Sequence, residues 1–347
     1  MNSDKPLIFI LILMKDNWKD TIECLQSLQN LNYERCQMVL IDNGSSHFYL
    51  QKILEWCRGE IPLETDYVKF KKDNFPVSFI IYSKEEAENG GVELKEKEIE
   101  NLPFNRKLVL IRISENLGFA GGNNTGIRYA LKRGADFVLL LNNDTVANPE
   151  LLNEMLKTME ADKRNGIVGG KIYFYQKPNI LQEVGGAKFY PFFGVVMPIG
   201  RGEIEKGQYN KDFEVDYASG CCSLLRRELI EEIGLLDENF FHYWEETDWN
   251  LRAKKRGWKV VCSTRAKVWH KLSSTSGYKS PFSDYYFTRN SLILTKKHYP
   301  YFLPFVFLFN FYKFPIRIFK KKWKNLYAVA KGMIDFLMGK KGKTFKN

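Results

Sequence analysis

Residues 7–45 read LIFILILMKDNWKDTIECLQSLQNLNYERCQMVLIDNGS, and this segment sets the expected fold class. Residues 7–13 form an uninterrupted apolar run that predicts a buried strand, and residues 20–31 have the apolar spacing of a helix. A second strand is expected at residues 37–41, and it ends in Asp42-Asn43-Gly44-Ser45. A strand, a helix and a strand in this order predict an α/β fold with a mostly parallel sheet flanked by helices, whose ligands bind beyond the carboxyl ends of the strands.

The rest of the chain extends this pattern. A catalytic domain is expected over residues 1–281, with a first half to about residue 145 and a second half over residues 146–281. A charged insertion, about residues 58–106, interrupts the first half, and we expect it to be a solvated surface element. Residues 282–347 form a basic, aromatic tail.

The net charge of +11 is concentrated near the C-terminus, because residues 313–347 hold eleven basic residues and one acidic residue. This distribution argues against nucleic acid as a partner and favours a cationic tail that meets an anionic surface. The six cysteines have no paired metal-ligand spacing, so we expect reduced, buried cysteines in a cytoplasmic protein.

The tail alternates apolar and basic residues, which is typical of a helical segment lying on anionic lipid. The alternative is a helical pair packed on the domain with a solvated basic end. Residues 301–312 are strongly apolar, but they are fewer than the roughly 20 residues of a spanning helix and are interrupted by Pro304. We therefore expect this segment not to cross a bilayer.

Two segments carry candidate ligand-binding residues. Residues 116–126 read NLGFAGGNNTG between an expected strand and a helix at residues 127–133, and such glycines allow close approach of the backbone to a diphosphate. Residues 139–145 read LLLNNDT, an apolar strand that ends at a carboxylate. One carboxylate together with a diphosphate is sufficient for a hard divalent cation. Each segment alone is also compatible with a simple turn.

The most acidic segment is residues 240–252, FFHYWEETDWNLR. Crowded carboxylates raise one another's pKa, and one of them is suited to remove a proton from an attacking hydroxyl. In a helix, Glu245 and Asp248 share one face, whereas Glu246 points about a hundred degrees away. The alternative is a set of acidic residues that stabilises a helix start.

Taken in order, these segments, together with Ser219-Gly220 and Trp269-His270-Lys271, resemble the family 2 glycosyltransferases, especially the rhamnosyltransferase-like branch. The resemblance covers roughly residues 7–300. It implies a GT-A fold, which is Rossmann-like, and inverting transfer of a sugar from a nucleotide donor.

The resemblance also implies roles for individual residues. Asp42 is expected to bind the nucleobase with Leu13 beside it. Glu246 is expected to be the catalytic base, with Asp248 as a second candidate, and Asp144 and His270 to hold Mg²⁺ or Mn²⁺. The other residues expected at the nucleotide-sugar are Asn116, Gly118, Gly121, Gly122, Asn123, Asn142 and Asn143, and those expected on the acceptor side are Gly220, Trp244 and Glu245.

Two residues depart from the family pattern. Asn142 stands where many relatives have the first carboxylate of the metal motif, and Glu246 stands where they have Asp. The longer Glu246 side chain shifts the proposed base, and a displacement of about an ångström matters in catalysis.

The expected function is therefore sugar transfer in polysaccharide synthesis, with rhamnose from a dTDP donor first and a UDP-sugar second. The expected acceptor is a glycan or a lipid-linked saccharide, at the cytoplasmic face of a membrane. A sugar nucleotidyltransferase and a dinucleotide oxidoreductase are disfavoured, because no glycine-rich signature follows the first strand. A catalytically impaired glycan-binding or scaffolding relative is the remaining alternative.

Overall fold

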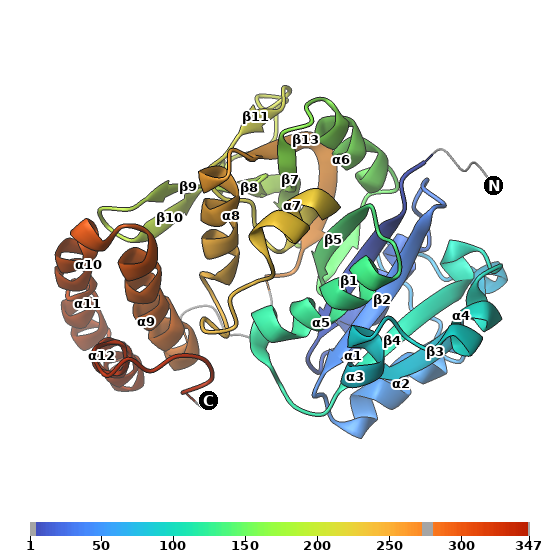
Figure 1. Cartoon of the computed structure of the whole chain (residues 1–347), viewed down its shortest axis with the longest axis horizontal. Coiled ribbons are helices and arrows are strands. Elements are labelled where there is room, and N and C mark those ends of the chain that lie inside the picture. Colours follow the sequence, from blue (N-terminus) through green and yellow to red (C-terminus); the bar gives the residue numbers. More distant parts are fainter. Residues whose placement is uncertain (1–4, 273–279, 346–347) are drawn as a thin grey trace.

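A mixed eleven-stranded sheet forms the centre of the molecule in the computed structural model, which describes residues 5–272 and 280–345 (Figure 1). The strands run in the order β11-β13-β7-β12-β5-β1-β2-β4-β3, with β6 beside β13 and β8 beside β7. The first half of the chain contributes β1 (Ile8–Met14), β2 (Cys36–Asn43), β3 (Ser78–Ser83), β4 (Lys107–Ile113), β5 (Phe137–Asn142) and β6 (Thr145–Ala147). The second half contributes β7 (Asn165–Phe174), β8 (Lys177–Val184), β11 (Phe213–Glu214), β12 (Cys222–Arg226) and β13 (Lys259–His270).

The first five strands pair in parallel, as the apolar runs predict. Their register aligns the polar residues at one edge of the sheet. Leu13 lies opposite Asn142, and Met14 lies opposite Asp42. The expected α/β class and mostly parallel sheet are confirmed, and the nucleotide-side candidates converge at the carboxyl ends of β1, β2 and β5.

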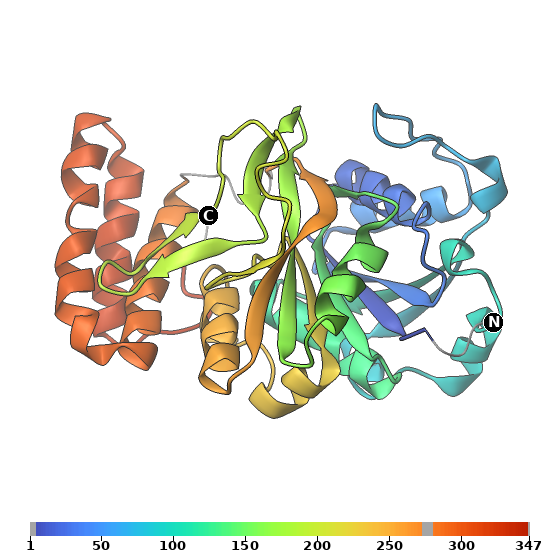
Figure 2. The ribbon, with the colours of Figure 1, turned by 90° about the horizontal axis from the view of Figure 1, so that it is seen from above.

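Helices cover both faces of the sheet (Figure 2). One apolar cluster joins one face of the strands to the first group of helices, and a second cluster joins the opposite face to the other group. The first group is α1 (Trp18–Leu28), α2 (His47–Cys57) and α6 (Leu151–Glu160). The second group is α5 (Gly118–Lys132), α7 (Arg227–Ile233) and α8 (Glu245–Lys255). The alternating side chains of buried parallel strands thus supply two cores.

Helix α5 corrects one expectation, because it begins at Gly118 and includes most of the segment predicted to be a loop. The glycines inside it let the helix pack closely on the sheet. A Cβ at Gly122 would lie 2.5 Å from Leu13 Cδ1, and one at Gly126 would lie 2.5 Å from Ile41 Cδ1. These glycines were interpreted as ligand-facing backbone, whereas they make room for strands β1 and β2.

The charged insertion is less detached than expected. Strand β3 forms the parallel edge of the main sheet, and the short helices α3 (Lys84–Glu88) and α4 (Glu93–Ile99) follow it. Glu96 of α4 is buried, and its Oε1 accepts hydrogen bonds from the hydroxyls of Tyr82 and Tyr129 at 3.0 and 2.5 Å. The insertion therefore docks on α5 and extends the sheet.

The second half of the chain brings His270 to the carboxyl edge of the sheet. Strand β13 pairs in parallel with β7 and antiparallel with β6, where His270 lies opposite Thr145. Because Thr145 follows Asp144, this pairing places two residues more than a hundred positions apart side by side. A separate two-stranded ribbon, β9 (Ala187–Tyr190) and β10 (Val195–Pro198), projects toward the C-terminal helices.

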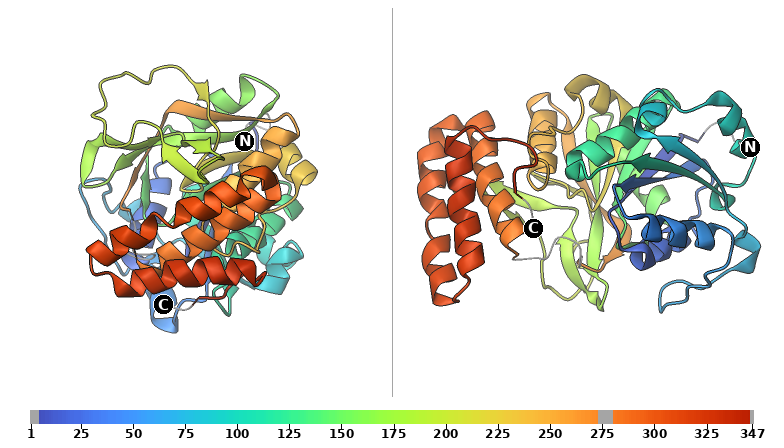
Figure 3. Two further views of the ribbon diagram at one scale, coloured as in Figure 1. Left: turned by 90° about the vertical axis from the view of Figure 1, so that its left-hand side faces the viewer. Right: turned by 90° about the horizontal axis from the view of Figure 1, so that it is seen from below.

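The C-terminal helices form a module at one end of the molecule (Figure 3). It contains α9 (Pro281–His298), α10 (Leu303–Asn310), α11 (Lys313–Phe319) and α12 (Trp323–Leu337). Tyr285, Leu292 and Met333 lie in its core, and most of α9 is buried. The expected helical tail is confirmed, but α9 packs as part of the folded body.

The structure corrects the expectation that residues 301–312 are too short to span a membrane, because the apolar helical segment extends beyond these twelve residues. Residues Pro300–Phe319 form one apolar helical segment of 20 residues with a hydropathy of 1.3, which is enough to cross a membrane by length and composition alone. Pro304 lies in the first turn of α10, where a proline is tolerated because no hydrogen bond is lost there.

Candidate active site

A cavity of about 570 Å³ lies between the two halves of the chain, at the carboxyl ends of β1 and β5. Ten of the sixteen predicted site residues line it: Leu13, Asn116, Gly118, Asn142, Asn143, Asp144, Trp244, Glu245, Glu246 and His270. The six predicted residues outside the lining are Asp42, Gly121, Gly122, Asn123, Gly220 and Asp248. Residues predicted to bind the nucleotide-sugar and residues predicted to face the acceptor therefore share one cavity.

Asp144 and His270 form a buried pair in this cavity. His270 Nε2 lies 3.1 Å from Asp144 Oδ1, while Asp144 Oδ2 is buried without a hydrogen-bond partner among the described residues. Burial raises the pKa of Asp144, but His270 and Lys271 outweigh it and hold the pKa below its ordinary value. The Gln182 side-chain amide lies 3.0 Å from His270 Nδ1 and fixes the ring.

This pair fits a divalent cation that is also held by a ligand. Within the described residues, no group of three or more His, Cys, Asp or Glu side chains could hold a metal by itself. A cation that bridges a diphosphate keeps only one or two protein ligands, and the partnerless Asp144 oxygen with the His270 nitrogen supplies two. Asn142 contributes no second carboxylate, and Asn143 donates to Thr21 Oγ1 at 2.8 Å.

Glu246 is held at the cavity by the loop before β12. Its Oε1 accepts from the Gly220 amide at 3.0 Å, and its Oε2 lies 3.4 Å from the Tyr217 hydroxyl. A Cβ at Gly220 would lie 2.3 Å from Glu246 Oε1, so only glycine allows this contact. Burial, with a smaller contribution from the nearby Glu183, raises the pKa of Glu246 to about 7, although the Gly220 hydrogen bond lowers it.

Two further buried carboxylates adjoin Glu246. Burial and the Glu246 charge raise the pKa of Glu245 well above its ordinary value. Burial also raises the pKa of Glu183, whose Oε1 has no hydrogen-bond partner among the described residues. Like charges this close raise one another's pKa, and Glu246, held by the Gly220 amide, has a pKa of about 7.

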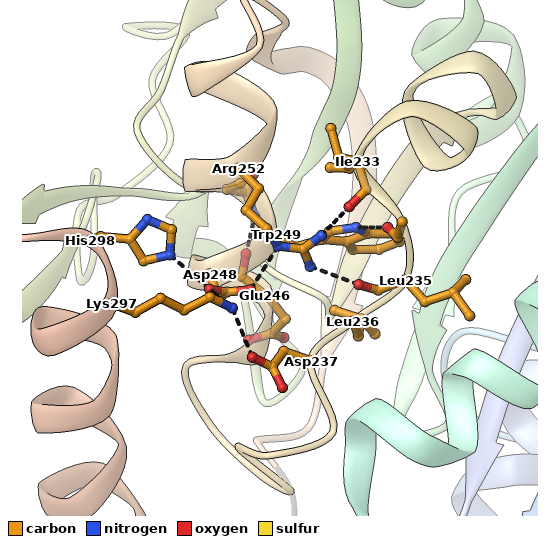
Figure 4. A network of polar contacts seen from close by, with 12 residues as sticks. Ile233, Leu235, Leu236, Asp237, Glu246, Asp248, Trp249, Arg252, Lys297 and His298 are labelled. Atoms are coloured by element: carbon orange, nitrogen blue, oxygen red, sulfur yellow. Dashed lines mark hydrogen bonds and ion pairs between the residues drawn. The ribbon is translucent and has the colours of Figure 1, made fainter.

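Asp248 points away from the cavity into a network of basic side chains (Figure 4). Its carboxylate accepts from Arg252 Nε at 2.8 Å and from Lys297 and His298 at 2.7 Å each. Burial raises the pKa of Asp248, but these three partners lower it to about 2. Asp248 therefore ties α8 to α9, and its placement favours Glu246 over Asp248 as the base.

Asp42 and the glycine segment flank the cavity. Asp42 is buried, and its Oδ1 accepts from the Ser45 amide at 2.9 Å, while its Oδ2 has no partner among the described residues. Gly121 and Gly122 lie inside α5, where Gly122 faces Leu13 and Asn43 of the sheet and Gly121 faces Leu117 and Glu238. The Asn123 side chain is buried and donates to Phe119 O at 3.0 Å.

The loop that leads into α8 adopts an unusual backbone. Phe241, Tyr243 and Trp244 have φ values of 66°, 65° and 78°, which a non-glycine residue adopts at a cost of about 1–2 kcal/mol each. Its residue His242 lines the cavity, and burial lowers the pKa of the imidazole to about 4, so the ring is neutral. Such strain at a cavity wall is typical of residues placed for function.

Sequence reasoning missed several cavity residues. Gln182, Tyr217 and His242 line the cavity, as do Phe282 and Phe287 of α9. The first two lie in a segment with no regular apolar pattern, and α9 was interpreted as a tail. The abrupt cluster of aromatic residues at positions 282–287 was the one available signal.

Comparison with known proteins agrees with this geometry. Residues 93–234 match the model of the family described as "Glycosyl transferase family 2". The dTDP-rhamnosyl transferase RfbF of Shigella flexneri is 26% identical over 205 residues, which are 56% of this chain and 65% of that protein. The low-salt glycan biosynthesis hexosyltransferase Agl10 of Haloferax volcanii is 28% identical over 183 residues, 51% of this chain and 57% of that protein. The matches thus span somewhat under two thirds of these curated relatives.

A solved structure shares the fold over nearly the whole chain. The mannosyltransferase PcManGT of Pyrobaculum calidifontis, solved with GDP-Man and Mn²⁺, superposes with a TM-score of 0.54. The match covers 97% of this chain and 89% of that one at 12% identity. The likeness to this structure supports a GT-A fold, and residues 93–234 of the chain match glycosyl transferase family 2.

Proposed function

We propose that the protein is a metal-dependent, inverting glycosyltransferase that moves a sugar from a nucleoside diphosphate donor onto a glycan or a lipid-linked saccharide. The observation that carries this proposal is the single cavity that joins the Asp144–His270 pair to Glu246. Leu13, Asp42 and Asn116 lie on the side of the donor nucleotide, and Trp244 and Glu245 lie on the acceptor side. The likeness to a dTDP-rhamnosyl transferase favours a dTDP-rhamnose donor, with a UDP-sugar as second choice.

Glu246 is the proposed general base. Its carboxylate accepts the proton of the acceptor hydroxyl as the acceptor oxygen forms a bond to the anomeric carbon. On the opposite side of that carbon, the bond to the diphosphate breaks, and the diphosphate leaves with the electron pair. The Gly220 amide and the Tyr217 hydroxyl hold the two Glu246 oxygens in place during this transfer.

Asp144 and His270 are the proposed holders of Mg²⁺ or Mn²⁺. The cation supplies neutralisation of the charge on the departing diphosphate. Asp144 Oδ2 and His270 Nε2 are available for this role, because neither atom has a hydrogen-bond partner among the described residues. His270 Nε2 lies 3.1 Å from the other Asp144 oxygen, Oδ1. Gln182 keeps the His270 ring oriented, as partners of metal-binding histidines do.

The test is incubation of the purified protein with Mn²⁺, a panel of dTDP-, UDP- and GDP-sugars, and membrane-extracted lipid acceptors. We expect release of nucleoside diphosphate from one donor and a product whose anomeric configuration, read by proton NMR, is opposite to that of the donor. A product with retained configuration would contradict the mechanism. Absence of any release would favour an impaired, glycan-binding relative.

The C-terminal module is a second part of the proposal, as the surface that holds the protein on the cytoplasmic face of an anionic membrane. Large apolar side chains remain exposed along α10, α11 and α12: Tyr301, Phe305, Leu308, Phe311, Tyr312, Ile316, Ile318, Phe319, Trp323, Tyr327, Ile334, Leu337 and Met338. Exposed lysines at positions 320–322 and 324 accompany them. Apolar and cationic groups together match the interface of anionic lipid.

The β9–β10 ribbon extends this surface. Phe192 and Phe193, both about four tenths exposed, lie at its tip with ring centroids 4.6 Å from Phe305 and 5.1 Å from Phe309. The Arg317–Asp284 ion pair at 2.6 Å, to α9, favours a module that lies on the membrane over one that inserts across it. A lipid-linked acceptor confined to the membrane surface would then reach the cavity.

Vesicle co-sedimentation tests this location. We expect binding to vesicles of phosphatidylcholine with phosphatidylglycerol, weaker binding to phosphatidylcholine alone, and a large loss in the double variant Tyr301→Ser, Phe319→Ser, whose side chains are 89% and 90% exposed. Phe48→Ser removes an exposed aromatic at the other end of the molecule and serves as the control. Equal binding by all variants, or self-association through this surface without lipid, would contradict the proposal.

A further inference from the structure

The loop of residues 240–244 lies immediately before helix α8, which carries Glu246. Contacts from another helix hold this loop in place. Its backbone turns through the left-handed region at three non-glycine residues, so neither helix nor sheet hydrogen bonds hold most of its carbonyls. The support comes from α9, which lies between α8 and the other C-terminal helices (Figure 1). The family match ends at residue 234, before both the loop and α9.

Asn290 of α9 contacts three carbonyls of this loop. Its Nδ2 lies 2.8 Å from Phe240 O, 2.9 Å from His242 O and 3.0 Å from Tyr243 O. The side chain is completely buried. The one remaining carbonyl between them, that of Phe241, accepts from the Phe119 amide at 2.9 Å on the donor side of the cavity.

Arg289 fixes the orientation of the Asn290 amide. Arg289 Nε donates to Asn290 Oδ1 at 2.9 Å, and because an arginine only donates, the amide nitrogen must face the loop. Arg289 Nη2 also donates to Phe240 O at 3.1 Å. The guanidinium is itself completely buried beside Tyr285 and Tyr286. The buried Asn290 amide is therefore held with its nitrogen facing the strained loop of residues 240–244.

The supported loop determines where the proposed base lies. Trp244 is the residue before α8, its carbonyl accepts from the Asp248 amide at 2.9 Å, and Glu246 follows two positions later. Trp244 Nε1 donates to Phe287 O of α9 at 3.2 Å, which adds a second tie at the same point. A change in the loop therefore changes the start of α8 and the approach of Glu246 to Gly220.

We propose that Asn290 is a positioning residue for Glu246 and that α9 is consequently part of the catalytic machinery. The inference rests on the proposed function, since it concerns the base of that reaction. Asn290 is not among the residues that line the cavity. Its amide holds the carbonyls of Phe240, His242 and Tyr243, and this fixes the loop that sets the start of α8.

The experiment compares Asn290→Ala with Asn310→Ala. Asn310 is a buried asparagine of the same helical module, and its Nδ2 donates to Val306 O at 2.8 Å, far from the cavity lining. We expect Asn290→Ala to lower kcat by about 100-fold, the effect of misplacing a catalytic group by an ångström. Affinity for the nucleoside diphosphate stays at the wild-type level. Asn310→Ala keeps wild-type kcat per folded molecule.

Hydrogen–deuterium exchange supplies a readout that does not need activity. Asn290→Ala should speed exchange in residues 240–250 and at the Phe119 amide, whereas Asn310→Ala should affect α10 and not this loop. If Asn290→Ala does not fold, Asn290→Asp takes its place, because a carboxylate of the same shape donates no hydrogen bond to the three carbonyls.

The proposal is overturned if the Asn290 variant keeps wild-type kcat, if kcat falls equally in the Asn310 variant, or if loop exchange is unchanged. It is also overturned if kcat and nucleotide affinity fall by the same factor, since that would mean a general loss of structure. A wild-type protein that transfers no sugar would refute the proposed function instead, and the exchange comparison would still show whether Asn290 holds the loop.

Discussion

At the scale of single residues, Glu246 and Asp248 show how two acidic side chains of one short motif reach opposite environments. Glu246 lies among buried carboxylates with a pKa raised to about 7, whereas Asp248 lies among three basic groups with a pKa lowered to about 2. The motif predicted that the three carboxylates could not share one role. It could not decide between the two candidates, because two of the three partners of Asp248, Lys297 and His298, come from α9, about fifty residues away.

Substitution of the two residues should separate their roles. Glu246→Gln removes the proton acceptor with little change in shape, so we expect loss of transfer by at least about 100-fold with nucleotide affinity unchanged. Asp248→Asn should instead lower the stability, because it leaves Lys297 and His298 without their common partner. Rate measurements on folded protein distinguish them, and loss of transfer in Asp248→Asn alone would show that the base is misassigned.

The pH dependence of the rate follows from the raised pKa of Glu246. The base acts as a carboxylate, and this form is lost as the pH falls through about 7. We expect kcat/KM to fall about tenfold from pH 8 to pH 6. Glu183→Gln removes a neighbouring carboxylate that raises this pKa, so the midpoint should move to lower pH. A flat profile over this range would contradict Glu246 as the base.

At the scale of elements, the sequence did not predict that the glycines of residues 118–126 lie inside helix α5. The segment was predicted to be a loop because four glycines in eleven residues disfavour a helix. The structure extends the helix through them, since the sheet lies too close for side chains at Gly122 and Gly126. The strands were predictable within a few residues because short apolar runs bounded by turn residues favour buried strands, whereas glycine is compatible with a turn, a ligand-binding loop or a closely packed helix.

Alanine substitutions at Gly122 and Gly126 distinguish an effect on helix packing from an effect on nucleotide binding. A Cβ at either site meets a side chain at 2.5 Å, so both Gly122→Ala and Gly126→Ala should lower the free energy of unfolding by about 1–3 kcal/mol. Only Gly122 contacts Leu13 and Asn43, which reach the cavity, so only Gly122→Ala should also weaken nucleotide binding. Denaturant unfolding and nucleotide titration measure the two effects, and equal affinities in both variants would count against a nucleotide site beside Leu13.

The connection of α8 to α9 makes a prediction about acid stability. The pKa of Asp248 is lowered to about 2, against about 3.9 in an unfolded chain. Its contribution is therefore present above pH 4 and is lost as the pH falls through 2, a change of about 2 kcal/mol. Asp248→Asn should be less stable than wild type at pH 6, and the difference should narrow by about this amount at pH 2, as followed by urea unfolding.

At the scale of the whole molecule, the C-terminal module has two faces with different roles. Its inner face, on α9, contacts the loop of residues 240–244, and its outer face, on α10 to α12, exposes apolar and basic side chains. The sequence predicted the outer face from composition alone. It could not predict the inner face, because Arg289 and Asn290 form no recognisable motif. Their contacts with the loop of residues 240–244 exist only in the folded protein.

The fold class and the first half of the chain were predictable, because they follow from the order of strands along the sequence. Adjacent strands in a parallel sheet bring their carboxyl ends together, so Leu13, Asp42 and Asp144 had to converge once the strands were recognised. The contact of His270 with Asp144 required knowledge of the β6–β13 pairing, which links distant parts of the chain.

The measurement that tests the central claim most directly is a thermal unfolding series with dTDP, UDP, GDP and CMP, with and without Mn²⁺, on the wild type and on Asp144→Ala. A ligand that binds only the folded protein raises the unfolding temperature. We predict a rise with one pyrimidine nucleoside diphosphate that requires Mn²⁺ and disappears in Asp144→Ala. The same rise in chelator and in the variant, or no rise with any nucleotide, would contradict a metal-dependent donor site at Asp144 and His270.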